Sequence, residues 1–482
     1  MNHRPEEVSG TLKLSTKPFK IGSRRYVAEH GTLMVPENRR KADSRSISIP
    51  ILRIRAANDQ RAEPIFWLEG GPGSSNLKFR PPAWLLAKHD IVMVGYRGVD
   101  GAVRLDCPEV SRALKRTGGD LLSAQSRTSL SRAMSDAVKR LRDDGADLAG
   151  YTIPEVVEDM EAARIALGYR RVNLLSASYG TRVAQMYAYR HPDSLYRSGM
   201  IGVNPPGHFV WEPATIDAQL NHYAALWARD PKNQVRTPDL AETMRQVIQH
   251  MPRRWLLLPI DPGKVKVVTF AMLFHRRAAA MVFDAYLAAA QGDASGLALM
   301  SLACDFLLPK MLVWGDLFAK GSSADFDLAR DYAAELNPSD SIMGSPLALL
   351  IWGSAAGAWP INLIPAELRQ VQPCDVETLL VSGSLDFSTP AEFATRELLP
   401  HLTRGKQVIL KEYGHVNDVF SIQPQIIERL LTSFYEMGVV DDSLVTCVPM
   451  DFHVPVGFPL LAKAALGVML LIMAIVIGFI LR

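Results

Sequence analysis

Leu174-Leu-Ser-Ala-Ser178-Tyr-Gly180 is the stretch of this sequence that decides the fold. It places a serine between small residues, after a strand-like run (Val172 to Leu175) and before a helix-like run (Thr181 to Arg190). This context predicts a nucleophile elbow, a sharp strand-to-helix turn that lifts a serine hydroxyl above the edge of a sheet. The residues two before and two after the serine face neighbouring backbone and must be small. Gly180 meets this requirement fully, and Ser176 stands where the usual pattern has glycine.

The composition is that of a globular protein with an apolar bias. The 482 residues are 48% hydrophobic and 21% charged, and the formal net charge is +3. This length predicts two or three structural units. Because lysine and arginine are scattered rather than gathered in a stripe, we expect no nucleic-acid partner. The four widely spaced cysteines show no zinc-ligand pattern, so we expect no metal site. We expect buried free thiols, with one or two disulfides as the alternative in an oxidising compartment, and no cofactor.

The first 205 residues (1–205) alternate strand-like and helix-like segments. Arg25 to Pro36 and Ser46 to Ile54 alternate apolar and polar residues, which predicts an antiparallel hairpin at a sheet edge. The short apolar runs Ile65 to Leu68 and Asp90 to Val94 are typical of buried parallel strands. We therefore predict an α/β fold with a mostly parallel sheet flanked by helices.

The rest of the chain divides into four parts. Strand-like runs nearly vanish in residues 206–368, which indicates an inserted helical cap, and the sheet resumes in residues 369–440. We predict a linker over residues 441–458 and a membrane anchor over residues 459–482.

The anchor is an uninterrupted apolar run of 18 residues, Ala464 to Leu481. As a helix it would be about 27 Å long, close to the hydrocarbon thickness of a bilayer. A buried core helix is the alternative, but a core helix with no polar face is rare at a chain terminus. We therefore expect a single-pass membrane protein whose C-terminal helix contacts lipid. The N-terminal residues lack the apolar core of a secretory signal, so we expect the globular part in the cytoplasm. Lys463 and Arg482 flank the helix on both sides, so the positive-inside rule does not indicate its orientation.

A serine hydroxyl becomes a good nucleophile only when a base removes its proton and an acid orients that base. Asp386 stands just after one strand-like run, and His415 stands just after the next. The order serine, aspartate, histidine is that of α/β-hydrolases. Taken singly, Asp386 could be a turn residue and His415 a loop histidine. Their order and positions favour a catalytic triad with Ser178 over the competing pair His208 and Asp418.

Backbone N–H groups must stabilise the negative oxygen that forms during acyl transfer. We expect one N–H from Tyr179, directly after the serine. We expect the second from Gly71, in the loop Gly70-Gly-Pro-Gly73, because glycine lets backbone approach a substrate closely. A tight turn without a catalytic role is the alternative for this loop.

Six short motifs point to one family: Glu69-Gly-Gly-Pro-Gly, Gly95-Tyr-Arg-Gly, Leu105-Asp-Cys-Pro, Ser178-Tyr-Gly-Thr, Gly383-Ser-Leu-Asp386 and Gly414-His415. Together they resemble the proline iminopeptidase and tripeptidyl aminopeptidase family of α/β-hydrolases, over residues 28–205 and 370–436. The resemblance implies Ser178 as nucleophile, Asp386 as orienting acid, His415 as base and a helical cap before the acid. The sequence departs from the family at Glu69, where a histidine is often found, and at Ser176, and the C-terminal apolar helix is not a general family feature.

Aminopeptidases of this family select a free N-terminus, which implies a carboxylate that binds the substrate amine in or near the cap. The candidates in this sequence are Glu69, Glu212 and Asp305. A helix cap or a surface position is the alternative for each of them.

We therefore hypothesise a membrane-anchored serine hydrolase, an aminopeptidase that cleaves peptide bonds near a free N-terminus through an acyl-enzyme. Its partner would be a short peptide or a small amide or ester substrate. An esterase with the same triad is the alternative among enzymes. The alternative that is not an enzyme is a catalytically silent, membrane-tethered binding protein. The sequence does not indicate the oligomeric state.

Overall fold

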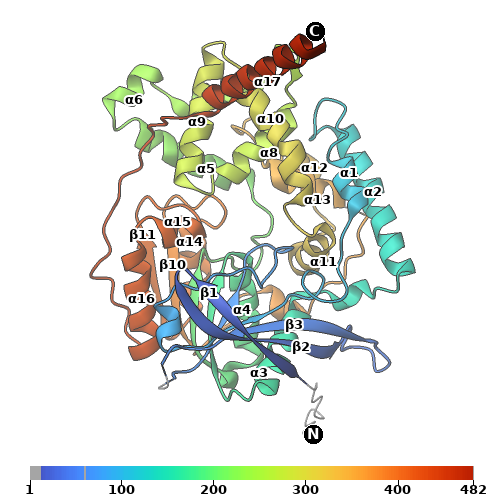
Figure 1. Cartoon of the computed structure of the whole chain (residues 1–482), viewed down its shortest axis with the longest axis vertical. Coiled ribbons are helices and arrows are strands. Elements are labelled where there is room, and N and C mark those ends of the chain that lie inside the picture. The colour runs from blue at the N-terminus through green and yellow to red at the C-terminus, as the bar shows by residue number, and fades with distance from the viewer. Residues whose placement is uncertain (1–11, 59–60, 356, 481–482) are drawn as a thin grey trace.

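The computed structural model describes residues 12–58, 61–355 and 357–480, and within them a nine-stranded sheet lies in the lower half of the view in Figure 1. The strand order is β1-β2-β3-β5-β4-β6-β7-β10-β11. The strands are β1 (Lys13–Ile21), β2 (Arg24–Pro36), β3 (Ser46–Ile54), β4 (Ile65–Leu68), β5 (Ile91–Val94), β6 (Val172–Ala177), β7 (Leu195–Ile201), β10 (Glu377–Gly383) and β11 (Gly405–Leu410).

The sheet is parallel from β5 to β11 and antiparallel from β1 to β5. The predicted hairpin is present as β2 and β3, where Ala28 pairs with Ile54. Its predicted place at the sheet edge is wrong, because β1 pairs outside β2. The side chains of β1 are mostly exposed, so this strand has no buried face that would give an apolar pattern.

Both faces of the parallel sheet are buried. In β4, Phe66 and Leu68 belong to a core shared with α3 (Ile153–Ala166) and α4 (Tyr179–Arg190). Ile65 and Trp67 belong to a second core, shared with α16 (Pro424–Met437). A strand covered on both faces is apolar at every position, which explains the unbroken runs in β4 and β5.

A layer of helices lies on one side of the sheet, in the upper half of the view in Figure 1. It contains η4 (Leu308–Lys310) and a short strand pair, β8 (Arg254–Trp255) with β9 (Leu258–Pro259). Two helices from the first half of the chain, α1 and α2, also belong to this layer, since α2 packs on α13 and α1 on η4. Its α-helices are α1 (Pro108–Ala113), α2 (Ala124–Asp143), α5 (Pro213–Trp227), α6 (Pro231–Arg236), α7 (Leu240–Gln249), α8 (Pro262–Met272), α9 (Arg276–Ala290), α10 (Ser295–Leu307), α11 (Trp314–Asp325), α12 (Tyr332–Glu335) and α13 (Pro346–Ala355).

The remaining helices around the sheet are short. They are η1 (Leu85–Ala87), η2 (Leu148–Gly150), η3 (Pro192–Ser194), η5 (Ala366–Arg369), α14 (Ala391–Phe393), η6 (Ala394–Leu398), η7 (Leu399–His401) and α15 (Val416–Ser421).

The segment after α16 is fixed to both the sheet and the helical layer. Arg276 of α9 donates hydrogen bonds to the carbonyls of Val448 and Pro449, at 2.8 and 2.6 Å. The Glu412 carboxylate accepts the Met450 N–H at 2.6 Å. Phe452 is buried against the rings of Trp227 and Phe283. This linker, called the strap below, is therefore attached to the body at several points.

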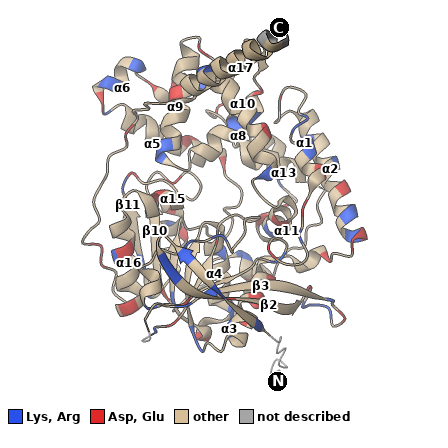
Figure 2. Ribbon diagram, in the orientation of Figure 1, with Lys and Arg blue, Asp and Glu red and all other residues tan. Residues whose placement is uncertain are grey.

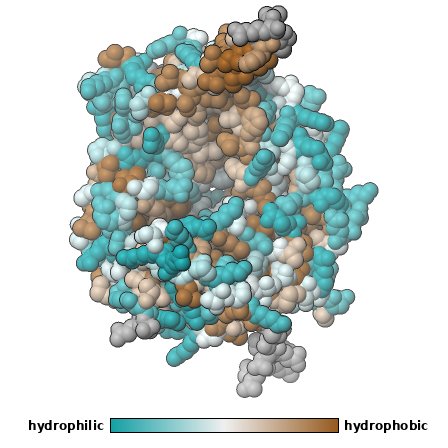
Figure 3. Space-filling model, viewed as in Figure 1, coloured by the Kyte–Doolittle hydropathy of each residue, from teal (hydrophilic) through white to brown (hydrophobic). Residues whose placement is uncertain are grey.

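The last helix, α17 (Phe458–Ile480), begins against the helical layer and then leaves it. Lys463 pairs with Asp293 at 2.7 Å, and Ala462 is buried, whereas the side chains from Val468 to Val476 are exposed. Figures 2 and 3 show α17 as an almost uncharged, strongly hydrophobic projection. Phe458–Val476 is long and apolar enough to cross a bilayer, with a mean hydropathy of 2.3.

Candidate active site

Ser178 occupies the turn between β6 and α4. Its φ of 52° and ψ of −121° are strained for a residue with a side chain, and such a conformation persists only where the surroundings hold it. Its N–H donates to the Ile201 carbonyl at 2.9 Å, and its own carbonyl accepts the Thr181 N–H at 2.9 Å. The backbone therefore has the geometry of the predicted elbow.

The small residues around Ser178 have the steric role that the sequence indicated. A Cβ on Gly180 would lie 2.2 Å from the Leu68 carbonyl oxygen, which no side chain could tolerate. Ser176 is fully buried, and its hydroxyl donates to the Gly199 carbonyl of β7 at 3.0 Å. This hydrogen bond satisfies the polar atom that the departure from glycine introduces.

Asp386 and His415 meet at the carboxyl ends of β10 and β11. His415 Nδ1 lies 2.7 Å from Asp386 Oδ2. The other carboxylate oxygen accepts the N–H groups of Ser388 and Thr389, at 3.0 and 2.8 Å. Because an ionised carboxylate only accepts hydrogen bonds, Nδ1 carries the proton and Nε2 is left as the basic nitrogen.

The helical layer also positions the histidine. The His415 N–H donates to the Phe274 carbonyl at 2.7 Å, and the Phe274 ring packs edge-on against the imidazole. Gly202 adjoins the other side, where a Cβ would lie 2.9 Å from His415 Cε1. The imidazole therefore has little freedom to rotate.

Ser178 and His415 line one cavity of about 340 Å³, together with Gly71 and Tyr179. No hydrogen bond joins Ser178 to His415 among the described residues, and such contacts are often long before substrate binds. The apolar walls of this cavity include Phe209, Trp211, Phe274, Leu317, Ile351 and Trp352. The cavity can thus enclose an apolar acyl group beside the serine.

His275, which the sequence did not single out, lines the same cavity. Burial holds the pKa of its imidazole below the usual value. It is therefore a neutral polar group at neutral pH, able to contact a substrate.

The glycine loop after β4 approaches the elbow closely. A Cβ on Gly70 would lie 3.2 Å from Ser178 Cβ, and Gly71 has a φ of 131°. Tyr179 is the first residue of α4, so its N–H has no partner within the helix. The two N–H groups predicted for the oxyanion thus belong to backbone on the wall of the cavity.

A buried ion pair in α11, between residues four apart, fixes this loop, and the sequence does not indicate its burial or its contact with Gly73. Asp316 accepts the Gly73 N–H at 3.0 Å and pairs with Lys320 at 2.6 Å, and both side chains are fully buried. Val313 N also donates to the Gly73 carbonyl at 2.9 Å. Lys320 additionally donates to the Arg97 carbonyl at 3.2 Å. The helical layer therefore holds both polar backbone groups of Gly73.

The three acids considered for amine binding lie in different surroundings. Glu69 lines the cavity, and burial raises the pKa of its carboxyl although the Gly70 N–H donates to it. Glu212 forms a two-point ion pair with Arg330, at 2.8 and 3.1 Å, and Asp305 pairs with Lys264 at 2.6 Å. Neither Glu212 nor Asp305 is among the residues that line the cavity.

The competing histidine and acid have other partners. His208 lies 2.7 Å from Glu397, and Asp418 accepts the N–H groups of Gly414 and Arg276, each at 3.0 Å. Within residues 12–58, 61–355 and 357–480, no group of three His, Cys, Asp or Glu side chains could hold a metal ion.

The fold is that of the α/β-hydrolases, and comparison with known proteins agrees. A family model of the alpha/beta hydrolase fold matches residues 63–261. The chain is 23% identical to a tripeptidyl aminopeptidase of Streptomyces coelicolor and 22% identical to one of Streptomyces lividans. Each match covers 87% of this chain and 83% of the relative. The resemblance to this aminopeptidase family is therefore confirmed.

The solved structures that resemble this chain are more distant in sequence. A serine hydrolase of Cycloclasticus zankles has a TM-score of 0.38 and 12% identity, covering 89% of this chain and all of that chain. A meta-cleavage product hydrolase of Pseudomonas fluorescens has a TM-score of 0.39 and 12% identity, covering 82% and 96%.

Proposed function

We propose that this protein is a membrane-anchored serine aminopeptidase. The observation that carries the proposal is the 2.7 Å contact between Asp386 and His415, beside a serine on a strained turn in the same cavity. The similarity to tripeptidyl aminopeptidases supports a peptide substrate with a free N-terminus. The apolar helix α17 supports the anchor.

The proposed reaction begins when Ser178 Oγ bonds to the carbonyl carbon of the scissile amide and its proton passes to His415 Nε2. The N–H groups of Gly71 and Tyr179 stabilise the oxyanion. The C–N bond then breaks, and the leaving amine takes the proton from His415. Water, with His415 as base, hydrolyses the acyl-enzyme, while Asp386 stabilises the imidazolium throughout.

We retain Glu69 as the group that meets the substrate amine, because it alone of the three candidate acids lines the cavity. An ammonium beside it would favour the ionised carboxylate and offset the rise in pKa that burial causes.

The test compares Ser178→Ala with the control Ser129→Ala, an exposed serine of α2. In detergent-solubilised protein, the first variant should lose fluorophosphonate labelling and hydrolysis, and the control should keep both. Full turnover by Ser178→Ala would exclude the serine mechanism. Alanyl and prolyl naphthylamides, measured against short acyl esters, separate a peptidase from an esterase.

Protease treatment of intact cells and of spheroplasts tests the membrane arrangement. We expect the globular part to be protected, as a cytoplasmic domain would be. Cleavage from outside would refute that orientation, and recovery of the full chain in the soluble fraction would refute the anchor.

A further inference from the structure

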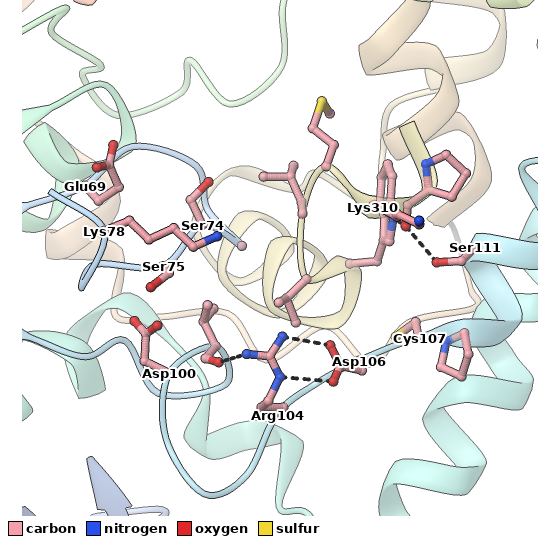
Figure 4. Close-up of a pocket in the computed structure, with 18 of the residues that line it drawn as sticks. Glu69, Ser74, Ser75, Lys78, Asp100, Arg104, Asp106, Cys107, Ser111 and Lys310 are labelled. Carbon is pink, nitrogen blue, oxygen red and sulfur yellow. Dashed lines mark hydrogen bonds and ion pairs between the residues drawn. The ribbon is translucent and has the colours of Figure 1, made fainter. Parts of the chain in front are cut away.

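A second, larger cleft adjoins the catalytic cavity. Its volume is about 810 Å³, and it shares Glu69, Ser74, Met311 and Leu312 with the cavity that holds Ser178. Its other walls come from the loop after β4, from the chain that leads into α1, and from η4 (Figure 4). A substrate held at Ser178 and longer than the 340 Å³ cavity can therefore continue into this cleft.

The acidic side chains that line the cleft already have hydrogen-bond donors. Asp106 pairs with Arg104 at 3.1 Å, and Asp100 accepts the backbone N–H groups of Asn76 and Tyr96, each at 2.9 Å. Glu69, the third acid, accepts the N–H of Gly70 where the cleft meets the catalytic cavity. Each of the three acids thus has a hydrogen-bond donor within the protein, and Asp106 is paired with a cation.

Four basic side chains of the cleft, in contrast, form no ion pair with any of the described residues: Lys78, Arg112, Lys115 and Lys310. They come from three segments far apart in the sequence, namely the loop after β4, the region of α1, and η4. The Ser111 hydroxyl, which donates to the Pro309 carbonyl at 2.9 Å, joins two of these segments. In Figure 4, Lys78 and Lys310 come from opposite sides of the view. The fold therefore gathers exposed positive charges around one hollow.

We propose that this cleft binds the leaving portion of the substrate and selects a portion that carries a carboxylate. The proposal rests on the peptidase function proposed above. The apolar cavity accepts the acyl group, and the basic cleft accepts the anion beyond the scissile bond. A short peptide offers such an anion at its C-terminus or in an acidic side chain. Because exposed ion pairs are individually weak and screened by salt, the preference lies mainly in KM and falls as salt rises.

The experiment uses three peptides of one sequence: one with a free C-terminal carboxylate, one with a C-terminal amide, and an amide with glutamate in the leaving portion. We expect wild-type kcat/KM to be about fivefold higher for either anionic peptide than for the neutral amide. The first peptide tests the terminal carboxylate, and the third tests the side chain. The double variant Lys115→Glu/Lys310→Glu should reduce the ratio to about one or below. The matched control is Lys139→Glu, an exposed lysine of α2 outside the cleft, which should keep the wild-type ratio.

Three outcomes would overturn the proposal, in two distinguishable ways. Equal kcat/KM on all three peptides, or a preference that survives the double charge reversal, would refute charge selection while leaving the peptidase function intact. Cleavage of none of the peptides by protein that still reacts with fluorophosphonate would refute the peptidase function, and the proposal with it.

Discussion

Replacing Asp316 with alanine removes the carboxylate that lies 2.6 Å from Lys320 Nζ and 3.0 Å from the Gly73 nitrogen. Both side chains of the pair are fully buried, so the ammonium is left without a counter-charge. Breaking a buried pair in this way costs about 3–5 kcal/mol, and an unsatisfied N–H costs about 1–3 kcal/mol. Since both costs arise from one carboxylate they overlap, and we expect the free energy of unfolding to fall by about 4 kcal/mol.

The double variant Asp316→Leu/Lys320→Met separates stability from positioning. Replacing a buried pair by apolar residues is often neutral, so most of the lost stability should return. The Gly73 N–H still lacks its acceptor, however, and small displacements of catalytic groups are costly. We therefore expect kcat and the fluorophosphonate labelling rate to stay at least about tenfold below wild type.

Urea titration and kinetics of the detergent-solubilised protein measure the two effects. A double variant with wild-type kcat would show that α11 does not hold the oxyanion loop in place. If Asp316→Ala lowered the free energy of unfolding by less than about 1 kcal/mol, the cost assigned to breaking the buried ion pair would be refuted.

Three further predictions follow from the site and its support. Asp386→Asn removes the charge that keeps the proton on His415 Nδ1, and turnover should fall about 10³–10⁴-fold; a loss below tenfold would contradict the triad. Gly180→Ala would force a Cβ to within 2.2 Å of the Leu68 carbonyl oxygen, so the free energy of unfolding in urea should fall by about 2–4 kcal/mol, and an unchanged midpoint would contradict the elbow. Although burial opposes it, the hydrogen bond with His191 lowers the pKa of Glu158 from 4.5 to about 2. The Glu158 carboxylate therefore stabilises the folded protein fully at pH values above the pKa that this group has in the unfolded chain. This stabilisation is lost as the pH falls through the lower pKa of the folded protein. In Glu158→Gln the acid loss of stability between about pH 5 and pH 2 should be smaller by about 1–3 kcal/mol, and parallel pH curves for the two proteins would refute this.

The elbow could be predicted from the sequence because its requirements are local. A strand, a serine, a glycine two residues later and a helix all lie within one short stretch, and the strand-end positions of Asp386 and His415 follow from the same reasoning. The parallel strands were recognisable because burial on both faces leaves a continuous apolar run.

Other features depend on contacts between distant segments, which a single sequence does not reveal. Asp316 meets Gly73 across 243 positions of the chain. Glu212 and Asp305 looked suitable for an amine because their partners, Arg330 and Lys264, were not known. The charge of an acidic residue can be read from the sequence, but what neutralises it depends on the fold.

The strap between α16 and α17 has a mechanical consequence. A flexible linker would let a tethered domain rotate freely over a membrane and sample every orientation. Here Arg276 and Glu412 bind the linker, Phe452 is buried in the helical layer, and Lys463 of α17 pairs with Asp293, so these contacts restrict rotation of the body relative to α17. With α17 in a bilayer, the opening of the active site would stay at one distance from the lipid surface and in one orientation relative to it. Substrates would then be selected by their distance from the membrane as well as by their chemistry.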